Sequence, residues 1–391
     1  MKVSELEKLF SDTRNQTASI VECVREEEML MQPHPWVSPI KWHLGHTTWF
    51  FEQMILKEID KDYQLDPEYC FAFNSYYDSF GKRVARDNRA SLVKPSLEDV
   101  MNYRHKTDRK ILDSLKAGVS DKVMTLCELG VHHEKQHQEL IFQDFKSIRS
   151  KQSKPEAVKN PLGLNFQSFE NPGHFDLKEG LYSIGKKAGG EGAFAYDNEQ
   201  PQHKVYLYPS KISNQLVTNK EYLEFMEAGG YDNFAFWLSD GWQWVDKQEL
   251  KAPLYWRKSE NTWQEFCLWK GWHSLDFDRP VSHVNYYEAY AYSKWKKARL
   301  PLEAELEIRQ GDTNQQESLW QWTTSDYNGY PGYKPANDAT MEYNSKFMCS
   351  QKVLRGGSSV TPKNHYRSSY RNFYYPQERW MYSGIRLAYD K

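Results

Sequence analysis

One ten-residue stretch, VHHEKQHQEL at 131–140, constrains what this chain can form more than any other part of the sequence. Each residue of an α-helix turns by about 100°, so His133 and His137 stand roughly 40° apart on one helix face. Two imidazoles at that spacing can bind a single metal ion. Gln136 lies beside this face, whereas Glu139 points about 240° away from His133 and is a poor ligand candidate. A pair of surface histidines on a polar helix is the alternative, and a third ligand elsewhere would argue against it.

The bulk properties of the chain exclude several classes of protein. A length of 391 residues predicts two domains, because one hydrophobic core seldom serves so long a chain. The net charge of -2 argues against nucleic acid or an anionic membrane as the main partner. No apolar run approaches the roughly 20 residues of a membrane span, and residues 1–31 are too charged for a signal peptide. Scattered cysteines without a CxxC pair indicate reduced thiols and a cytoplasmic protein: Cys23, Cys70, Cys127, Cys267 and Cys349.

The N-terminal part of the chain carries hydrophobic residues at helical spacing. Four helices are predicted, at about 3–32 (broken, or split in two), 39–56, 95–116 and 121–148. The second is expected to begin with Ser38 as its N-cap and Pro39 at its first position. Residues 62–88 are rich in Tyr, Asn, Asp and Gly and have no period, which predicts a long functional loop. The pattern favours a four-helix bundle over residues 1–147.

The second half of the chain has a different texture. Residues 148–164 are rich in lysine, serine and proline and predict a linker. From 165 to 391, short apolar runs alternate with Gly, Pro, Asn and Asp, and helices are expected at 219–227 and 286–297. Aromatic residues make up 15% of the chain and crowd this half, so aromatic packing is expected to stabilise it. The whole sequence therefore predicts a two-domain α+β protein.

A metal site needs a third ligand, and the helix predicted at 39–56 offers two candidates. His43 and His46 are three residues apart, so both cannot point equally well toward His133 and His137. His46 follows Gly45, which permits the close approach of a neighbouring helix or an ion. We therefore predict His46, His133 and His137 as ligands, with His43 packed or hydrogen-bonded beside them.

The same histidine pair also fits the HExxH pattern of zinc proteases, in which Glu134 would be the general base. Leu140 and Gln143 stand where an extended metzincin motif has Gly and His, and Glu156, a candidate third ligand, falls in the predicted linker. Three histidines leave up to three positions open on a six-coordinate ion, which suits iron(II) that must bind two substrates and O2. Zinc with three histidines would instead activate water, and the ligand type alone does not separate the two metals.

Three parts of the chain together resemble one family. Residues 38–46, SPIKWHLGH, resemble its first-ligand helix, and His133-x3-His137-x-Glu139 resembles its iron motif. The C-terminal end resembles a formylglycine-generating-enzyme-like domain over residues 354–358, 370–376 and 379–388. A DinB-like four-helix bundle fused to such a domain, which is C-type-lectin-like, is the architecture of the ergothioneine-biosynthesis sulfoxide synthases (EgtB-type hercynine oxygenases). The ovothiol sulfoxide synthases are related to them.

The resemblance implies a mononuclear non-haem iron, Fe2+, held by His46, His133 and His137. Such an enzyme uses O2 to join a thiol to the imidazole of hercynine (N-α-trimethylhistidine) and leaves a sulfoxide. Binding the imidazole, the thiolate and O2 at one ion turns a three-body encounter into a local one. The implied substrates are hercynine, O2 and a thiol, and our hypothesis for the thiol is L-cysteine, as in the cysteine-using branch of the family.

The resemblance also suggests which residues bind hercynine. Trp380 and Tyr382 are candidates for the aromatic faces that a quaternary ammonium group needs. Gln136 is a candidate for a hydrogen bond to the substrate imidazole. Domain packing is the alternative role for Trp380. The C-terminal domain is then expected to be a substrate-binding wall, with the active site between it and the helical bundle.

The long loop supplies the remaining candidates. Arg86 and Arg89 correspond by spacing to an arginine pair that binds the sulfur donor in the family, and they could clamp its carboxylate. Two solvated arginines are the alternative. Tyr76 and Tyr77 resemble the tyrosine pair of members that use free cysteine, and one of them is expected to donate a proton or a hydrogen atom. Buried packing is the alternative for the other.

Three other functions are compatible with the sequence. The same scaffold could act on histidine, as the ovothiol enzymes do, or use a selenium donor. A zinc hydrolase built on HExxH is a second class, and a non-enzymatic binding module of the DinB kind is a third. Of all these, we predict an iron-dependent sulfoxide synthase: a cytoplasmic oxidoreductase with small-molecule substrates and no nucleic-acid or membrane partner.

Overall fold

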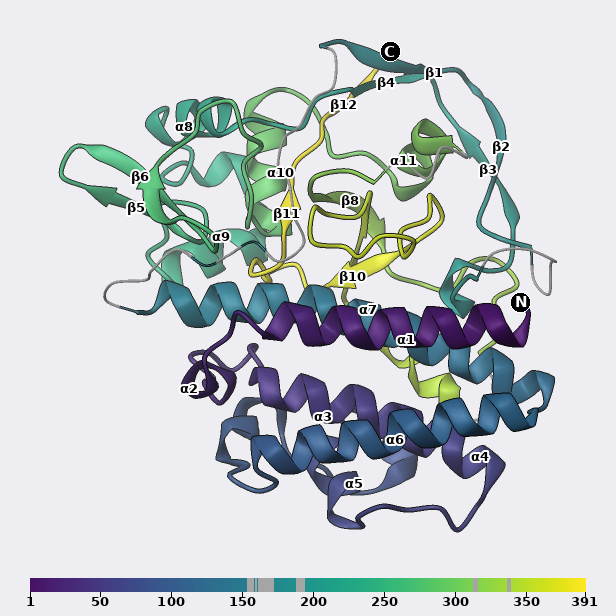
Figure 1. Ribbon diagram of the computed structural model, residues 1–391. Coiled ribbons are helices and arrows are strands. Elements are labelled where there is room, and N and C mark those ends of the chain that lie inside the picture. Colours follow the sequence, from purple (N-terminus) through teal and green to yellow (C-terminus); the bar gives the residue numbers. More distant parts are fainter. Residues whose placement is uncertain (153–157, 159, 161–171, 188–193, 312–315, 336–338) are drawn as a thin grey trace. The chain divides into compact units, whose positions relative to one another are not determined.

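The computed structural model in Figure 1 describes residues 1–152, 158, 160, 172–187, 194–311, 316–335 and 339–391. The chain divides into two compact units. One contains Met1–Gly163 and Asn337–Tyr343, and the other contains Leu164–Ala336 and Asn344–Lys391. A short piece from late in the sequence therefore belongs to the N-terminal unit. No described helix is both long enough and apolar enough to cross a membrane.

The first unit is helical. Its long helices are α1 (Val3–Val21), α3 (Ile40–Phe50), α6 (Leu97–Ala117) and α7 (Asp121–Ser150). The shorter segments are α2 (Glu26–Met29), the π-helix η1 (Phe51–Leu56), α4 (Lys57–Ile59), α5 (Glu68–Phe73), and the 3-10 turns η2 (Asp78–Phe80), η3 (Arg86–Ser91) and η7 (Ala339–Glu342). α1 packs on α7, and α3 packs on both α6 and α7, which gives the predicted four-helix arrangement (Figure 1).

The start of α3 differs from the prediction. The helix begins at Ile40, and Ser38 does not cap it. The Ser38 hydroxyl accepts a hydrogen bond from Arg89 Nη1 at 2.8 Å, and the Ser38 N–H donates to Asp144 Oδ2 at 2.9 Å. Both polar groups of Ser38 therefore bind other parts of the bundle, which is why its hydroxyl does not serve the first turn of α3.

The segment predicted as a long loop, 62–88, contains more helix than expected. α5 and η2 lie within it, and η3 begins in it. The Trp42 indole N–H donates to the Ala72 carbonyl at 3.0 Å, which ties α5 to α3. A Cβ atom at Gly45 would stand 2.1 Å from the Phe73 ring. Phe73 is the last residue of α5, so Gly45 admits a neighbouring helix, which is one of the two alternatives predicted for it.

α7 runs to Ser150 and so enters the segment predicted as a linker, 148–164. Ile148 and Arg149 are buried, and Arg149 Nη1 pairs with Glu28 Oε1 at 2.7 Å. This packing against α2 extends the helix through a stretch whose polar composition suggested a linker. Residues 153–157, 159 and 161–164 of that segment lie outside the described residues, so the domain boundary stays a prediction.

The second unit combines small sheets with short helices. Its strands are β1 (His174–Leu177), β2 (Gly180–Ile184), β3 (His203–Leu207), β4 (Ser210–Ser213), β5 (Trp256–Ser259), β6 (Thr262–Cys267), β7 (Gly271–Ser274), β8 (Trp320–Asp326), β9 (Lys352–Arg355), β10 (Asn372–Tyr374), β11 (Ser383–Gly384) and β12 (Ala388–Asp390). The described strands pair in the orders β1-β4-β12, β10-β9-β8-β11, β2-β3 and β5-β6-β7. Neighbours are antiparallel except β11 and β8, which are parallel. The predicted α+β class is confirmed.

The helices of the second unit are partly as expected. They are α8 (Asn219–Glu227), α9 (Ser239–Lys247), α10 (Tyr286–Trp295) and α11 (Glu303–Gln310), with 3-10 turns η4 (Asp197–Glu199), η5 (Phe234–Phe236) and η8 (Ser345–Phe347). α8 and α10 confirm the two predicted helices, whereas α9 and α11 are additional. α11 has buried carboxylates, each bound by an arginine: Glu303–Arg371, Glu305–Arg299 and Glu307–Arg355. Pairing with guanidinium groups makes the burial of these carboxylates possible. A search for hydrophobic residues at helical spacing cannot detect a helix that is buried through charged side chains.

Candidate metal centre

Three histidines from two helices converge inside the first unit. His46 lies on α3, and His133 and His137 lie one turn apart on α7. Each offers one ring nitrogen, and these atoms all lie within 4.8 Å of one another. All three side chains are buried, and His43, the other candidate on α3, is not part of the group. A set of three imidazole nitrogens suits a divalent transition metal such as iron or zinc.

The His46 ring is fixed in one tautomer. Its Nδ1 lies 2.6 Å from the Phe73 carbonyl oxygen, and because a carbonyl can only accept, Nδ1 carries the proton and donates. The lone pair is then on Nε2, which is buried and has no hydrogen-bond partner in the structure. The indole of Trp42 stacks on the ring with centroids 4.6 Å apart. An imidazole oriented by a carbonyl, with an orphaned buried nitrogen, fits a metal ligand.

His133 and the charge state of the three rings also fit a metal site. The His133 ring packs on Phe50 with centroids 4.2 Å apart, and its Nδ1 is buried and has no hydrogen-bond partner among the described residues. Burial lowers the pKa of His133 to about 3. Burial, together with the neighbouring histidines, holds the pKa of His46 and of His137 well below the usual value. All three imidazoles are therefore neutral near pH 7, which is the form that binds a metal.

Glu134, the general base of the zinc-protease alternative, is committed to an ion-pair cluster. Its carboxylate accepts hydrogen bonds from Arg14 Nη1 at 2.6 Å, from Thr17 Oγ1 at 2.6 Å and from Arg104 Nη2. Burial alone would raise the pKa of Glu134, but the two guanidinium groups lower it to about 2. A carboxylate bound in this way is poorly suited to take a proton from a metal-bound water, so the geometry argues against a hydrolase.

Tyr343, a residue that sequence reasoning missed, lies beside the histidines. It belongs to the short piece of chain that joins the first unit from late in the sequence. Its ring centroid is 5.7 Å from that of His133 and 6.3 Å from that of Phe50. Its hydroxyl donates to Gln136 Oε1, so the predicted imidazole-binding glutamine contacts a phenol next to the histidine group. No local pattern marks Tyr343 in the sequence, because only the tertiary fold brings it to α7.

The tyrosine pair predicted as catalytic precedes η2. The rings of Tyr76 and Tyr77 stack with centroids 4.5 Å apart, and their hydroxyl oxygens are 3.3 Å apart. Tyr77 is fully buried, and its ring centroid is 6.3 Å from that of Phe50. The Glu342 carboxylate accepts from the Asp78 N–H at 2.7 Å, so the piece that carries Tyr343 also anchors this loop. The catalytic role of either tyrosine stays a prediction.

The two arginines predicted to clamp a carboxylate lie in different surroundings. Arg89 is buried, donates to the hydroxyls of Ser38 at 2.8 Å and Ser75 at 3.0 Å, and lies 3.3 Å over the ring of Trp42. Within the described residues it forms no ion pair, and burial, with the nearby charge of Arg86, holds its pKa well below the usual value. Arg86 is exposed and donates to a backbone carbonyl at 2.7 Å. A buried guanidinium without a carboxylate is a favourable place for an anion.

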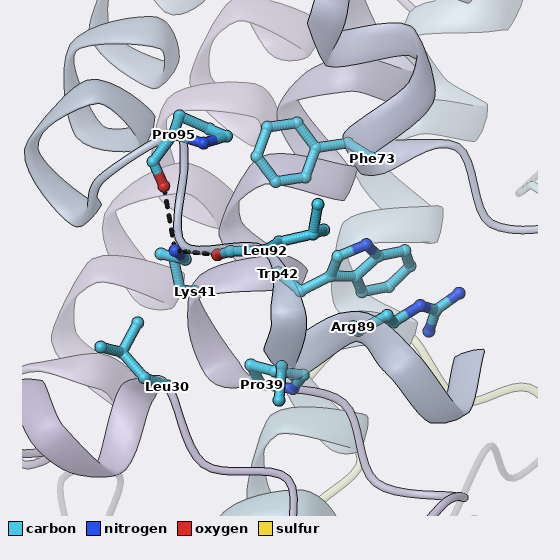
Figure 2. A pocket seen from close by; sticks show the side chains of 9 residues that line it. Leu30, Pro39, Lys41, Trp42, Phe73, Arg89, Leu92 and Pro95 are labelled. Carbon is cyan, nitrogen blue, oxygen red and sulfur yellow. Dashed lines mark hydrogen bonds between the residues drawn. The ribbon is translucent and has the colours of Figure 1, made fainter. Parts of the chain in front are cut away.

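Figure 2 shows a pocket on this side of α3, walled by Arg89, Trp42 and Phe73 among others. Lys41 also lines it, and its ammonium group donates to the carbonyls of Leu92 at 2.8 Å and Pro95 at 2.9 Å (Figure 2). Because the ammonium of Lys41 already donates to backbone carbonyls, Arg89 is the better candidate for binding an anionic ligand.

Trp380 and Tyr382, the predicted ammonium-binding residues, belong to the second unit, and both are buried. Trp380 packs edge-on against Tyr374 with centroids 5.4 Å apart, and its carbonyl oxygen lies 3.1 Å from His283 Nδ1. The Tyr382 ring centroid is 4.7 Å from that of the same histidine. Their part in binding a substrate stays a prediction.

Fold and site together define a two-domain α+β protein with a three-histidine candidate metal centre in its helical unit. Residues 164–319 and 317–391 match the family model of the sulfatase-modifying factor enzyme 1-like domain, and residues 9–141 match the DinB superfamily. The first of these matches covers more than half of the chain, so the chain belongs to the family with a sulfatase-modifying factor enzyme 1-like domain.

Relatives resemble the chain over nearly its whole length. The hercynine oxygenase of Mycobacterium tuberculosis is 27% identical over 414 residues, which cover 93% of this chain and 94% of that protein. The hercynine oxygenase of Mycolicibacterium thermoresistibile is 27% identical over 99% of this chain and 95% of that protein. Ergothioneine biosynthesis protein 1 of Schizosaccharomyces pombe is 23% identical over 58% of this chain and 30% of its own length. The predicted resemblance to the sulfoxide synthases, the two-domain architecture and the assignment to the oxidoreductases are thereby confirmed.

The ion pairs of Glu134 generate a stability prediction. In E134Q, Arg14 and Arg104 lose their shared carboxylate, so the free energy of unfolding of the first unit should fall by about 3–5 kcal/mol. Urea unfolding of the metal-free protein, followed by far-UV circular dichroism, measures this. The exposed carboxylate of Asp113 on α6 provides the control, because D113N should change stability by less than about 0.5 kcal/mol. An E134Q variant with unchanged stability and an abolished hydrolase activity would instead support the zinc-protease alternative.

Proposed function

We propose that this protein is an iron(II)- and O2-dependent sulfoxide synthase that joins L-cysteine to hercynine in ergothioneine biosynthesis. The observation that carries the proposal is the convergence of the three buried, neutral imidazoles of His46, His133 and His137. Relatives named hercynine oxygenases support it, since they match 93–99% of the chain. Three nitrogen ligands suit iron(II) and leave positions for substrates. A cytoplasmic location completes the proposal.

The proposed reaction balances with O2 as the oxidant. The S–H bond of the thiol and one ring C–H bond of hercynine break, and a C–S bond forms. One oxygen atom of O2 becomes the sulfoxide oxygen, and the other leaves as water with the two hydrogens. Bound iron(II) would supply the centre at which O2 is activated. The chain's own part is to hold the two substrates together and to move a proton.

Arg89 is the proposed partner for the carboxylate of the thiol substrate. It is a buried cation with no ion pair within the described residues, and it stacks on Trp42, which in turn stacks on His46. An anion bound at Arg89 would therefore lie one aromatic ring away from the metal centre. Arg86, three residues earlier and exposed, is proposed to assist at the outer side.

Hercynine is proposed to use two kinds of contact. Gln136, which lies beside the metal-ligand face of α7, binds the substrate imidazole. The contact of Gln136 with the Tyr343 hydroxyl fixes the orientation of its amide. Trp380 and Tyr382 are proposed to face the trimethylammonium group, because a quaternary ammonium has no N–H to donate and is best bound by aromatic rings.

Two other functions are less well supported. Action on histidine, as in the ovothiol enzymes, or with a selenium donor would use the same ligands and differs only in the substrate that the pocket accepts. A zinc hydrolase needs Glu134 as a base, and that carboxylate is bound by Arg14 and Arg104.

Anaerobic reconstitution tests the proposed activity. Protein loaded with iron(II) and given hercynine, L-cysteine and O2 should form a product whose mass equals both organic substrates plus one oxygen atom, less two hydrogens. H46A should lose both the bound iron and the product, because two histidines seldom hold the ion. Metal analysis and mass spectrometry measure these outcomes. Tightly bound zinc with peptidase activity would contradict the proposal, and an H46A variant of unchanged function would favour a binding module.

Substitution of Arg89 tests the binding of the thiol. R89L should raise the KM for cysteine, with kcat/KM for cysteine about 10- to 150-fold lower, because a charge-assisted hydrogen bond contributes about 1.5–3 kcal/mol. The KM for hercynine should change little. R109A, at an exposed arginine on α6, is the matched control. Equal loss for both substrates would contradict a thiol-specific role, and a preference of the wild type for γ-glutamylcysteine would contradict cysteine as the donor.

Three tyrosine-to-phenylalanine variants test the proton donor. Removing the phenolic O–H that serves the reaction should lower the yield of sulfoxide about 100-fold or more and divert O2 toward oxidation of the thiol alone. Y343F, Y76F and Y77F are compared by the ratio of coupled product to oxidised cysteine. Y63F, at a half-buried tyrosine between α4 and α5, is the control. Unchanged ratios in all three variants would show that none of these phenols donates.

A further inference from the structure

A hydrogen-bond relay runs from Asp144 through His43 to His137, which is one member of the three-histidine group. His43 Nδ1 lies 2.8 Å from His137 Nδ1, and His43 Nε2 lies 2.9 Å from Asp144 Oδ2. All three side chains are buried. His43 and Asp144 are not members of the ligand group, and the proposed reaction does not use them.

The Asp144 carboxylate at one end of the relay determines which ring nitrogens carry the protons. A carboxylate only accepts, so His43 Nε2 carries the proton that is donated to Asp144. A neutral His43 then has a bare Nδ1, which must accept. The proton between the two rings therefore belongs to His137 Nδ1, and the lone pair of His137 is on Nε2.

Asp144 is itself held in place. The same Oδ2 atom that accepts from His43 also accepts from the Ser38 N–H at 2.9 Å. On α7, Asp144 lies seven residues after His137, which is about two turns, so both side chains are on the same helix face. His43 projects from α3 between them. The relay therefore spans the two helices that carry all three candidate ligands.

His46 is fixed by the same principle with a different partner. Its Nδ1 donates to the Phe73 carbonyl, and its Nε2 is buried with no hydrogen-bond partner in the part of the chain that the structure describes. Two of the three candidate ligands thus have Nδ1–H bound and Nε2 available. Acceptors behind metal-bound histidines fix the tautomer and the ring orientation, and their loss typically weakens metal binding 10- to 100-fold.

We infer that His43 and Asp144 are positioning residues, which hold the Nδ1–H of His137 and so present its Nε2 to a divalent metal ion. The inference rests on the metal site of the proposed function and adds to it the residues that orient one ligand. Neither residue touches the metal or a substrate in this role; both act through His137.

A pair of variants of equal shape tests the relay. Asn and Leu have nearly the same size, but only Asn can accept a hydrogen bond close to the place of Nδ1. The probe is Co2+ alone, titrated into the full-length metal-free protein and followed by its visible d–d absorption bands. H43L should bind Co2+ about 10- to 100-fold more weakly than the wild type, with altered bands. H43N should recover most of the lost affinity and a spectrum closer to that of the wild type.

Control variants distinguish failure of the relay from failure of folding and from failure of the metal site itself. H105N removes an exposed imidazole of α6 and should bind Co2+ as the wild type does. Equal affinities and spectra of H43L and H43N would overturn the relay, since the two side chains are similar in size and only that of Asn can accept from His137 Nδ1. If the variants at 43 do not fold, D144L and D144N carry the same comparison, with tighter binding expected for D144N and equal binding overturning the inference. A wild-type protein that binds no Co2+ would instead refute the metal site itself.

Discussion

The buried carboxylate of Glu134 sets the rotation of α7 about its own axis. Arg14 from α1 and Arg104 from α6 both bind it, so this side of α7 must face those two helices. Neighbouring residues of a helix stand about 100° apart, which leaves His133 and His137 on a different side, where His46 of α3 meets them. Breaking a buried ion pair costs about 3–5 kcal/mol, so rotations that would separate the histidines are disfavoured. The candidate metal centre therefore depends on an interaction that binds no metal.

Local helix geometry made the three histidines predictable from the sequence. Features that depend on contacts between distant parts of the sequence were not predictable in this way. The spacing of His133 and His137 defines a helix face without any knowledge of the tertiary fold, and the glycine before His46 signals a close approach. The N-cap prediction failed because the partners of Ser38 are far away in the sequence: Arg89 is 51 positions away and Asp144 is 106 positions away. Side-chain capping rules assume that the nearest backbone N–H groups have no stronger competitor.

The same reasoning explains what the sequence did not reveal. Tyr343 reaches Gln136 across 207 positions, and the segment around it has neither a period nor a motif of its own. α11 was not predicted because its carboxylates are typical of a solvent-exposed surface. In the structure they are buried against arginines such as Arg355 and Arg371. A hydrophobic pattern records apolar burial, and both cases are buried polar contacts.

Charge governs which ligands the centre favours. Three neutral imidazoles leave a divalent ion with its full charge, and Arg89 adds a buried cation without an ion pair within the described residues. The nearby acids offset little of this: the charge of Glu134 is balanced by two arginines, and Asp144 brings a single negative charge against those of the ion and Arg89. In a poorly solvated site, unbalanced positive charge favours anions strongly. A thiol that ionises and carries a carboxylate can satisfy both the ion and Arg89, whereas a trimethylammonium substrate must keep its own charge on aromatic faces elsewhere. If the proposed function holds, these charges favour an amino-acid thiol as the second substrate.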